Sequence, residues 1–212
     1  MSDFLNLLLQ HTITMMAIVD PLGVSAIMLS LLPQSTTKEQ MDTIALKATM
    51  SIVVAFVVVL ATGNFLLNLF GIEIDSLKTM GGIVLLLTAI KMVQGSLEDK
   101  QQSDEEREEA ISNDAFAVIP LGIPITFGPG IFATIIILRG QSHDMLSISA
   151  LILAYAIVAL SVYLSFKNSI YIRKYLGITG QKIVTRLMGL IVGAIAVQFI
   201  VGGISVLVKH YM

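Results

Sequence analysis

A single carboxylate, Asp20, stands inside an apolar stretch that runs from Phe4 to Leu32. Pro21 follows it at once, and Gly23 comes two residues later. Proline has no backbone N–H and clashes with the preceding turn, so a helix must break or kink there. In a membrane, a carboxylate and freed backbone groups are costly unless protein or a water-filled cavity satisfies them. A break of this kind is typical of a binding site inside a membrane protein.

A second break lies about a hundred residues further on, in segment 120–130, which reads PLGIPITFGPG. Gly128 and Pro129 repeat the arrangement of a cap residue followed by a proline in the first turn of a helix. Thr126 is a second candidate for the cap, and Gly130 follows the proline. Each break therefore starts a new half-helix, whose free N–H groups and positive dipole end point back into the protein.

Two helix N-termini and one carboxylate can bind a molecule that carries both charges. An anionic group suits the free N–H groups, and an ammonium group pairs with Asp20. The residues expected to bind such a substrate are Asp20, Pro21, Gly23, Thr126, Gly128, Pro129 and Gly130. The alternative is that Asp20 only caps its half-helix and that the glycines only allow close packing.

The composition indicates an all-α, polytopic membrane protein of the cytoplasmic membrane. Of the 212 residues, 55% are hydrophobic and 13% are charged, about half the charged share of a soluble domain. Six apolar stretches are long enough to predict spans. They cover residues 4–32, 45–70, 79–93, 116–138, 148–166 and 183–208. The first and fourth spans contain the breaks.

The connections carry their own signals. Ser35 or Thr37 is expected to cap the second span, and Gly71 is expected to end it. Residues 73–78 are expected to link spans 2 and 3, and a basic segment, 167–186, to link spans 5 and 6. Segment 98–114 holds eight acidic and two basic residues, which predicts a flexible acidic linker. In span 6, glycines 189 and 193 have the spacing that lets helices approach closely.

An internal duplication is indicated by three matches in order. An offset of 108 places Pro129 on Pro21 and segment 186–192 on segment 78–84. Segments 69–72 and 175–178 also match, with a slip of two residues. We therefore predict one membrane domain, 1–212, with three-helix repeats at 1–95 and 115–212 and the acidic linker at 96–114. An odd number of spans in each repeat makes the second copy inverted.

The distribution of lysine and arginine predicts the orientation. Ten lie in or beside the turns between spans 1 and 2, 3 and 4, and 5 and 6, and three lie on the opposite side. The positive-inside rule places these three turns in the cytoplasm and both termini outside.

Enzyme motifs are missing from the sequence, including G-x-S-x-G and H-E-x-x-H, and Asp20 has no second intramembrane aspartate. No cofactor, metal or nucleic-acid partner is expected. We predict a secondary transporter of a small zwitterionic metabolite, with a proton or sodium as a candidate coupling ion. The alternatives are an exporter or channel for another small solute or ion, and a non-transporting membrane subunit that binds a partner. The oligomeric state is left open.

Four motifs together resemble the MarC family of inner-membrane proteins. They are DPLG at 20–23, PLGIP at 120–124, GPG at 128–130 and RLMGL at 186–190. The resemblance covers essentially the whole chain. It implies six spans, periplasmic termini, a relation to LysE-like transporters and transport of a neutral amino acid.

Overall fold

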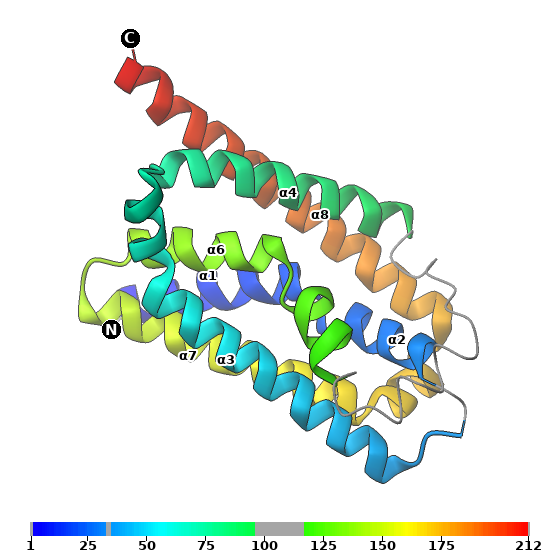
Figure 1. Cartoon of the computed structure of the whole chain (residues 1–212). Helices are drawn as coiled ribbons and strands as arrows, with labels where there is room; N and C mark the ends of the chain where they lie inside the picture. The colour runs from blue at the N-terminus through cyan, green and yellow to red at the C-terminus, as the bar shows by residue number, and fades with distance from the viewer. Residues whose placement is uncertain (1, 33–34, 96–116, 212) are drawn as a thin grey trace.

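The computed structural model describes residues 2–32, 35–95 and 117–211, and all its regular elements are helices (Figure 1). They are α1 (Ser2–Val19), α2 (Pro21–Leu31), α3 (Lys38–Phe70), α4 (Ile74–Gln94), η3 (Val118–Thr126), α6 (Pro129–Gln141), α7 (Met145–Lys167) and α8 (Ser169–Tyr211). The all-α prediction is confirmed for these residues. The predicted acidic linker lies outside them.

Five segments of the described chain are long and apolar enough to cross a membrane. They are Asp3–Leu31, Lys38–Phe70, Ile74–Gln94, Met145–Lys167 and Ser169–His210. The fourth predicted span, 116–138, corresponds to two short elements, the nine-residue η3 and the 13-residue α6. Each of these is too short to cross a bilayer alone, because a helix rises only about 1.5 Å per residue.

The two ends of α3 are set by local capping. The Thr37 hydroxyl accepts a hydrogen bond from the Gln40 N–H at 3.3 Å, and the Gln40 side chain accepts one from the Thr37 N–H at 2.8 Å. This capping box starts the helix at Lys38, so the prediction of Thr37 as a cap is confirmed, and the helix begins seven residues before the predicted span 45–70. At the other end Gly71 adopts a left-handed conformation with φ 65°, as predicted.

Two predicted links are helical instead. Helix α4 begins at Ile74, so residues 73–78 do not form a connection. The basic segment 167–186 belongs largely to α8, which is interrupted only at Gly177, where φ is 64° and ψ is 174°. Charged residues indicate where the chain leaves the apolar layer of the membrane. They do not end a helix, because lysine and arginine are good helix formers. The helices therefore extend beyond the predicted spans.

The largest contact between two helices joins α4 to α8, which run antiparallel (Figure 1). A Cβ added to Gly189 would lie 2.8 Å from the Cβ of Met92 and 3.1 Å from the carbonyl oxygen of Ala89. At Gly193 the nearest atom would be the Cβ of Ala89 at 3.6 Å. The absence of side chains at these positions lets the backbones approach, which confirms the predicted close packing.

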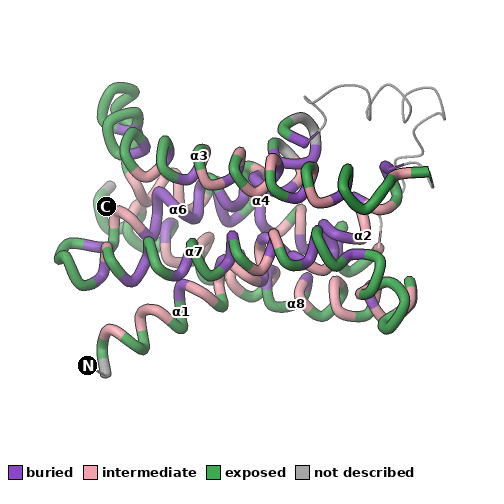
Figure 2. Tube along the Cα trace, turned by 90° about the horizontal axis from the view of Figure 1, so that it is seen from below, coloured by how far each residue is buried: buried purple, intermediate pink, exposed green. Residues whose placement is uncertain are grey.

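The other half of the bundle is built on α3 and α7. The rings of Phe56 and Tyr155 stack with their centroids 3.8 Å apart, and the Tyr155 hydroxyl donates to the Ile52 carbonyl at 2.9 Å. Helix α1 and helix α2 also pack on α7, and η3 and α6 pack on α3. Figure 2 shows buried residues on the inner faces of these helices and exposed residues along their outer faces. Many exposed side chains are large and apolar, as expected at a surface that faces lipid.

Candidate functional site

The first break is a single residue, Asp20, between α1 and α2. Its backbone is left-handed, with φ 45° and ψ 70°, a conformation that aspartate tolerates better than most residues. Its Oδ1 accepts a hydrogen bond from the Gly23 N–H at 3.2 Å, and Pro21 occupies the first turn of α2. The predicted aspartate cap and proline start are therefore confirmed.

The other carboxylate oxygen, Oδ2, is buried and makes no hydrogen bond of regular geometry with any residue that the structure describes. The Thr185 hydroxyl of α8 lies beside the carboxylate. Gly23 makes this approach possible, because a Cβ there would collide with the Asp20 carboxylate and lie 2.8 Å from the Thr185 Oγ1. Asp20 itself is only 6% exposed. An oxygen with an unused capacity to accept hydrogen bonds is thus held inside an apolar bundle.

The second break is longer and has a different geometry. The chain first forms η3, a π-helix in which the Phe127 N–H donates to the Gly122 carbonyl at 2.8 Å. Gly128 then caps α6 in an extended conformation, and Pro129 occupies its first turn, as predicted. Thr126 does not cap α6: no side chain accepts a hydrogen bond from the first turn of α6, and the Thr126 hydroxyl donates to the Leu121 carbonyl at 2.7 Å. The first N–H groups of α6 therefore have no side-chain cap.

The two breaks line the same cavity, which has a volume of about 440 Å³. Of the seven residues predicted to bind a substrate, six line it and Pro21 does not. The six are Asp20, Gly23, Thr126, Gly128, Pro129 and Gly130. The structure thus brings together the parts of a site from two distant segments, while the binding of a substrate by these residues stays a prediction.

Gly130 takes part in packing as well as in the cavity wall. A Cβ added to it would lie 2.7 Å from the Cδ2 of Leu85, a fully buried residue of α4, and 3.9 Å from the Cγ2 of Ile18. The start of α6 therefore sits directly against α4 and close to the end of α1. A side chain at this position requires Leu85 to move.

Five polar residues of the cavity were not predicted from the sequence. Helix α2 contributes Ser30, α4 contributes Thr88 and Lys91, and α8 contributes Lys182 and Thr185. In the sequence both lysines indicate only the cytoplasmic turns, and residue 185 lies in the predicted span 183–208. Their positions depend on how α4 and α8 pack around the breaks. The spacing of Lys182 and Thr185, which puts them on one helical face, is the only sequence signal.

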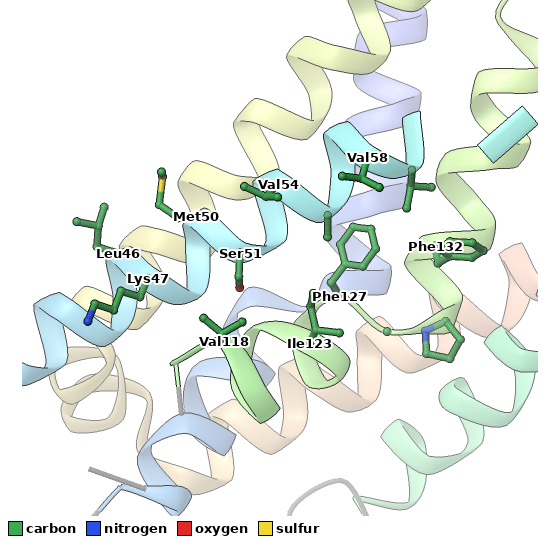
Figure 3. Close-up of a pocket in the computed structure, with 14 residues that line it drawn as sticks. Leu46, Lys47, Met50, Ser51, Val54, Val58, Val118, Ile123, Phe127 and Phe132 are labelled. Carbon is green, nitrogen blue, oxygen red and sulfur yellow. The ribbon is translucent and has the colours of Figure 1, made fainter. Parts of the chain in front are cut away.

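A second, apolar groove of about 950 Å³ lies on the other side of the α6 break (Figure 3). It runs between α3, which contributes Met50, Val54 and Val58, and the segment that carries η3 and Phe132. These three α3 residues are each more than half exposed. Residues 128 and 129 line both spaces, so the break forms part of the wall between a polar cavity and a groove on the apolar surface.

The chemistry of the cavity is that of charge and hydrogen-bond recognition. Among the residues that the structure describes, it combines one carboxylate, two ammonium groups, four hydroxyl groups and the start of α6, whose N–H groups have no side-chain cap. In the ranges 2–32, 35–95 and 117–211, no three histidine or acidic side chains lie close enough to hold a metal ion. The arrangement can bind a small molecule that carries both a positive and a negative group.

The sequence pattern described as "MarC family integral membrane protein" matches residues 5–208. A UPF0056 membrane protein from Aquifex aeolicus is 32% identical over 99% of this chain and 98% of its own length. The UPF0056 membrane protein YhcE from Escherichia coli is 31% identical over 91% of this chain and 89% of its own. One from Methanocaldococcus jannaschii is 34% identical over 89% of this chain and 91% of its own. Among solved structures no match is found.

Proposed function

The chain belongs to the MarC family of integral membrane proteins, and on that premise we propose that it transports a small zwitterionic metabolite, by class a neutral amino acid, across the cytoplasmic membrane. The observation that carries this proposal is the shared cavity. A buried carboxylate and the free start of a half-helix, from segments about a hundred residues apart, line one space inside an apolar bundle.

The cost of the Asp20 carboxylate supports a role in binding. The described residues offer this carboxylate the Gly23 N–H and the nearby Thr185 hydroxyl but no positive partner at hydrogen-bond distance, and a buried carboxylate without an opposite charge lowers stability. A ligand ammonium group would supply the missing partner. The capping function alone does not require the charge, because asparagine caps a helix about as well as aspartate.

The packing pattern supports the inverted repeat that belongs to this proposal. Helix α2 packs on α7 and α8, and α6 packs on the corresponding helices of the other half, α3 and α4. In the same way α1 packs on α7 and η3 on α3, while α3 pairs with α7 and α4 with α8. A two-fold relation between residues 1–95 and 115–212 produces these matched pairs. In this arrangement η3 and α6 together form the fourth span, which brings the total to six, and both termini lie outside.

Transport would proceed without nucleotide hydrolysis, because the sequence has no ATP-binding motif. A gradient of protons or sodium would drive it, or the substrate would move down its own gradient. The inverted repeat suits alternating access, in which one half moves against the other around a site at their interface.

The direct test is uptake and binding by liposomes that contain only this purified chain. L-Valine serves as a neutral zwitterion, and Asp20→Asn is the matched variant, because it keeps the cap and removes the charge. We expect valine flux with the wild-type chain and a loss of flux with the variant at equal reconstitution. A wild-type chain that neither binds nor moves zwitterions would contradict the proposal and favour a subunit that binds a protein partner. Flux that is equal in both proteins would leave Asp20 with capping alone.

A further inference from the structure

We infer that Lys91 and Lys182 form the anion-binding part of the cavity and hold the ligand carboxylate, while Asp20 holds the ligand ammonium group. The inference rests on the proposed function and assigns to two side chains the role that the sequence suggested for the start of α6. It also predicts how the ligand is oriented between the two halves of the site.

The two lysines reach the cavity from different helices. Lys182 is three residues before Thr185 on α8, about 4.5 Å along the helix axis and on the same face, and Thr185 lies beside the Asp20 carboxylate. Lys91 is six residues, or about 9 Å, beyond Leu85 on α4, the residue that packs on the start of α6. Each lysine therefore lies at some distance along its helix from the residue of that helix that contacts a break.

These helix segments also lie next to each other. Helix α4 ends at Gly95, and a Cβ added there would lie 3.3 Å from a guanidinium nitrogen of Arg186 on α8. One turn earlier on α4, Met92 contacts Gly189. Lys91 and Lys182 thus line one cavity from two adjoining helices, at different depths along them.

A full charge favours the lysines over the helix terminus. The start of α6 offers a partial charge of about +0.5, and Leu85 covers it at Gly130. Each lysine offers a full positive charge and three donors on a flexible stem. The two ammonium groups that the described residues place in the cavity wall therefore attract an anionic group more strongly than the helix terminus does.

Position distinguishes these two lysines from the others. The positive-inside rule explains why lysines gather near the ends of spans, but it does not require any of them to line a cavity. Lys174, on the same helix as Lys182 and exposed, lines neither the cavity nor the apolar groove. It therefore serves as a control with the same charge.

Three related ligands test the contributions of the carboxylate and the ammonium group separately. L-Valine carries both groups, isobutylamine is valine without its carboxylate, and 3-methylbutanoate is valine without its ammonium group. Binding of each is measured with the full chain in lipid nanodiscs for the wild type and for Lys91→Gln, Lys182→Gln, Lys174→Gln and Asp20→Asn. Lys91→Arg and Lys182→Arg test rescue by the charge.

We expect Lys91→Gln and Lys182→Gln each to weaken valine and 3-methylbutanoate by about threefold to thirtyfold, and isobutylamine by less than twofold. The range lies between that of an exposed ion pair and that of a buried charged hydrogen bond. Asp20→Asn should show the opposite selectivity, with a loss for valine and isobutylamine. Lys174→Gln should match the wild type, and the arginine variants should retain most of the affinity for valine.

Two results overturn the inference alone. One is valine affinity that is unchanged in both glutamine variants, and the other is an equal loss for valine and isobutylamine, which indicates a structural effect. In either case valine binding by the wild type leaves the proposed function standing. A wild-type chain that binds none of the three ligands removes the proposed function, and the inference with it.

Discussion

Substituting Asp20 by asparagine, glycine and alanine separates what its charge does from what its shape does. The structure gives this residue two structural tasks: it adopts a left-handed backbone with φ 45°, and its carboxylate accepts the Gly23 N–H. Asparagine can do both, since it caps a helix and tolerates this conformation. Glycine keeps only the backbone freedom, and alanine keeps neither.

The magnitudes follow from these tasks. Loss of a cap to alanine lowers stability by about 0.5–2 kcal/mol, and a left-handed alanine adds about 1–2 kcal/mol. We therefore expect Asp20→Ala to have a free energy of unfolding roughly 1.5–4 kcal/mol lower than that of Asp20→Asn, which also removes the charge. Glycine as a cap costs only a few tenths of a kcal/mol. Asp20→Asn should be at least as stable as the wild type, because it removes a buried charge.

Chemical unfolding of the purified variants in lipid bicelles, run beside isobutylamine binding, measures both quantities. The expected order of stability is asparagine, then glycine, then alanine, with isobutylamine binding reduced in all three. Alanine and asparagine variants that are both as stable as the wild type would refute the account of the break as a capped left-handed turn. An asparagine variant as unstable as alanine would show that the charge itself holds the fold, and its proposed use in binding would lose its main support.

Three further predictions concern other parts of the chain. Gly189→Ala should destabilise the α4–α8 contact by about 1–3 kcal/mol, whereas Gly193→Ala, where the nearest atom is at 3.6 Å, should have little effect on unfolding. Asp144 caps α7 outside its span, and hydrogen bonds from the Ser147 hydroxyl and from backbone N–H groups hold the pKa of its carboxyl below its usual 3.8. The stability that this carboxylate contributes is therefore complete above pH 3.8 and is lost as the pH falls through its lower folded pKa. Hydrogen exchange in the first turn of α7 should show this loss in the wild type and not in Asp144→Asn. Reporter fusions should place the acidic segment 98–114 in the cytoplasm and the C-terminus outside, and a cytoplasmic C-terminus would exclude an odd number of spans in each repeat.

Local chemistry was enough to predict where the chain breaks. Pro21 and Pro129 cannot continue a helix, and Thr37 and Gly71 have side-chain and backbone properties that suit helix ends. These features act over three or four residues, so they can be read directly from the sequence. The alternative cap at Thr126 was wrong, because this residue ends the π-helix and its hydroxyl donates to the Leu121 carbonyl within that helix, while Gly128 takes the cap position of α6.

Features that depend on packing were not predictable in the same way. The left-handed conformation of Asp20, the π-helical form of segment 118–126 and the full length of α8 do not follow from hydropathy. The same holds for the lining of the cavity. Lys91 and Lys182 belong to helices that meet only in the folded bundle, and a lysine near the end of a span has a simpler explanation from topology. The site predicted from the sequence therefore contained residues of the two breaks and lacked the cavity residues of α4 and α8.

The pairing of α4 with α8 has a consequence for the time course of biosynthesis. Helix α4 leaves the ribosome long before α8, yet a Cβ on its Gly82 would lie 2.7 Å from Ile200 and 2.8 Å from the Ala196 carbonyl, both on α8. A glycine-rich face made to fit another backbone leaves a poor fit to lipid chains. The nascent chain must therefore wait in the membrane with this face uncovered until its last helix arrives. Cellular quality control has that interval in which to recognise it, and a premature stop codon within α8 makes the interval permanent.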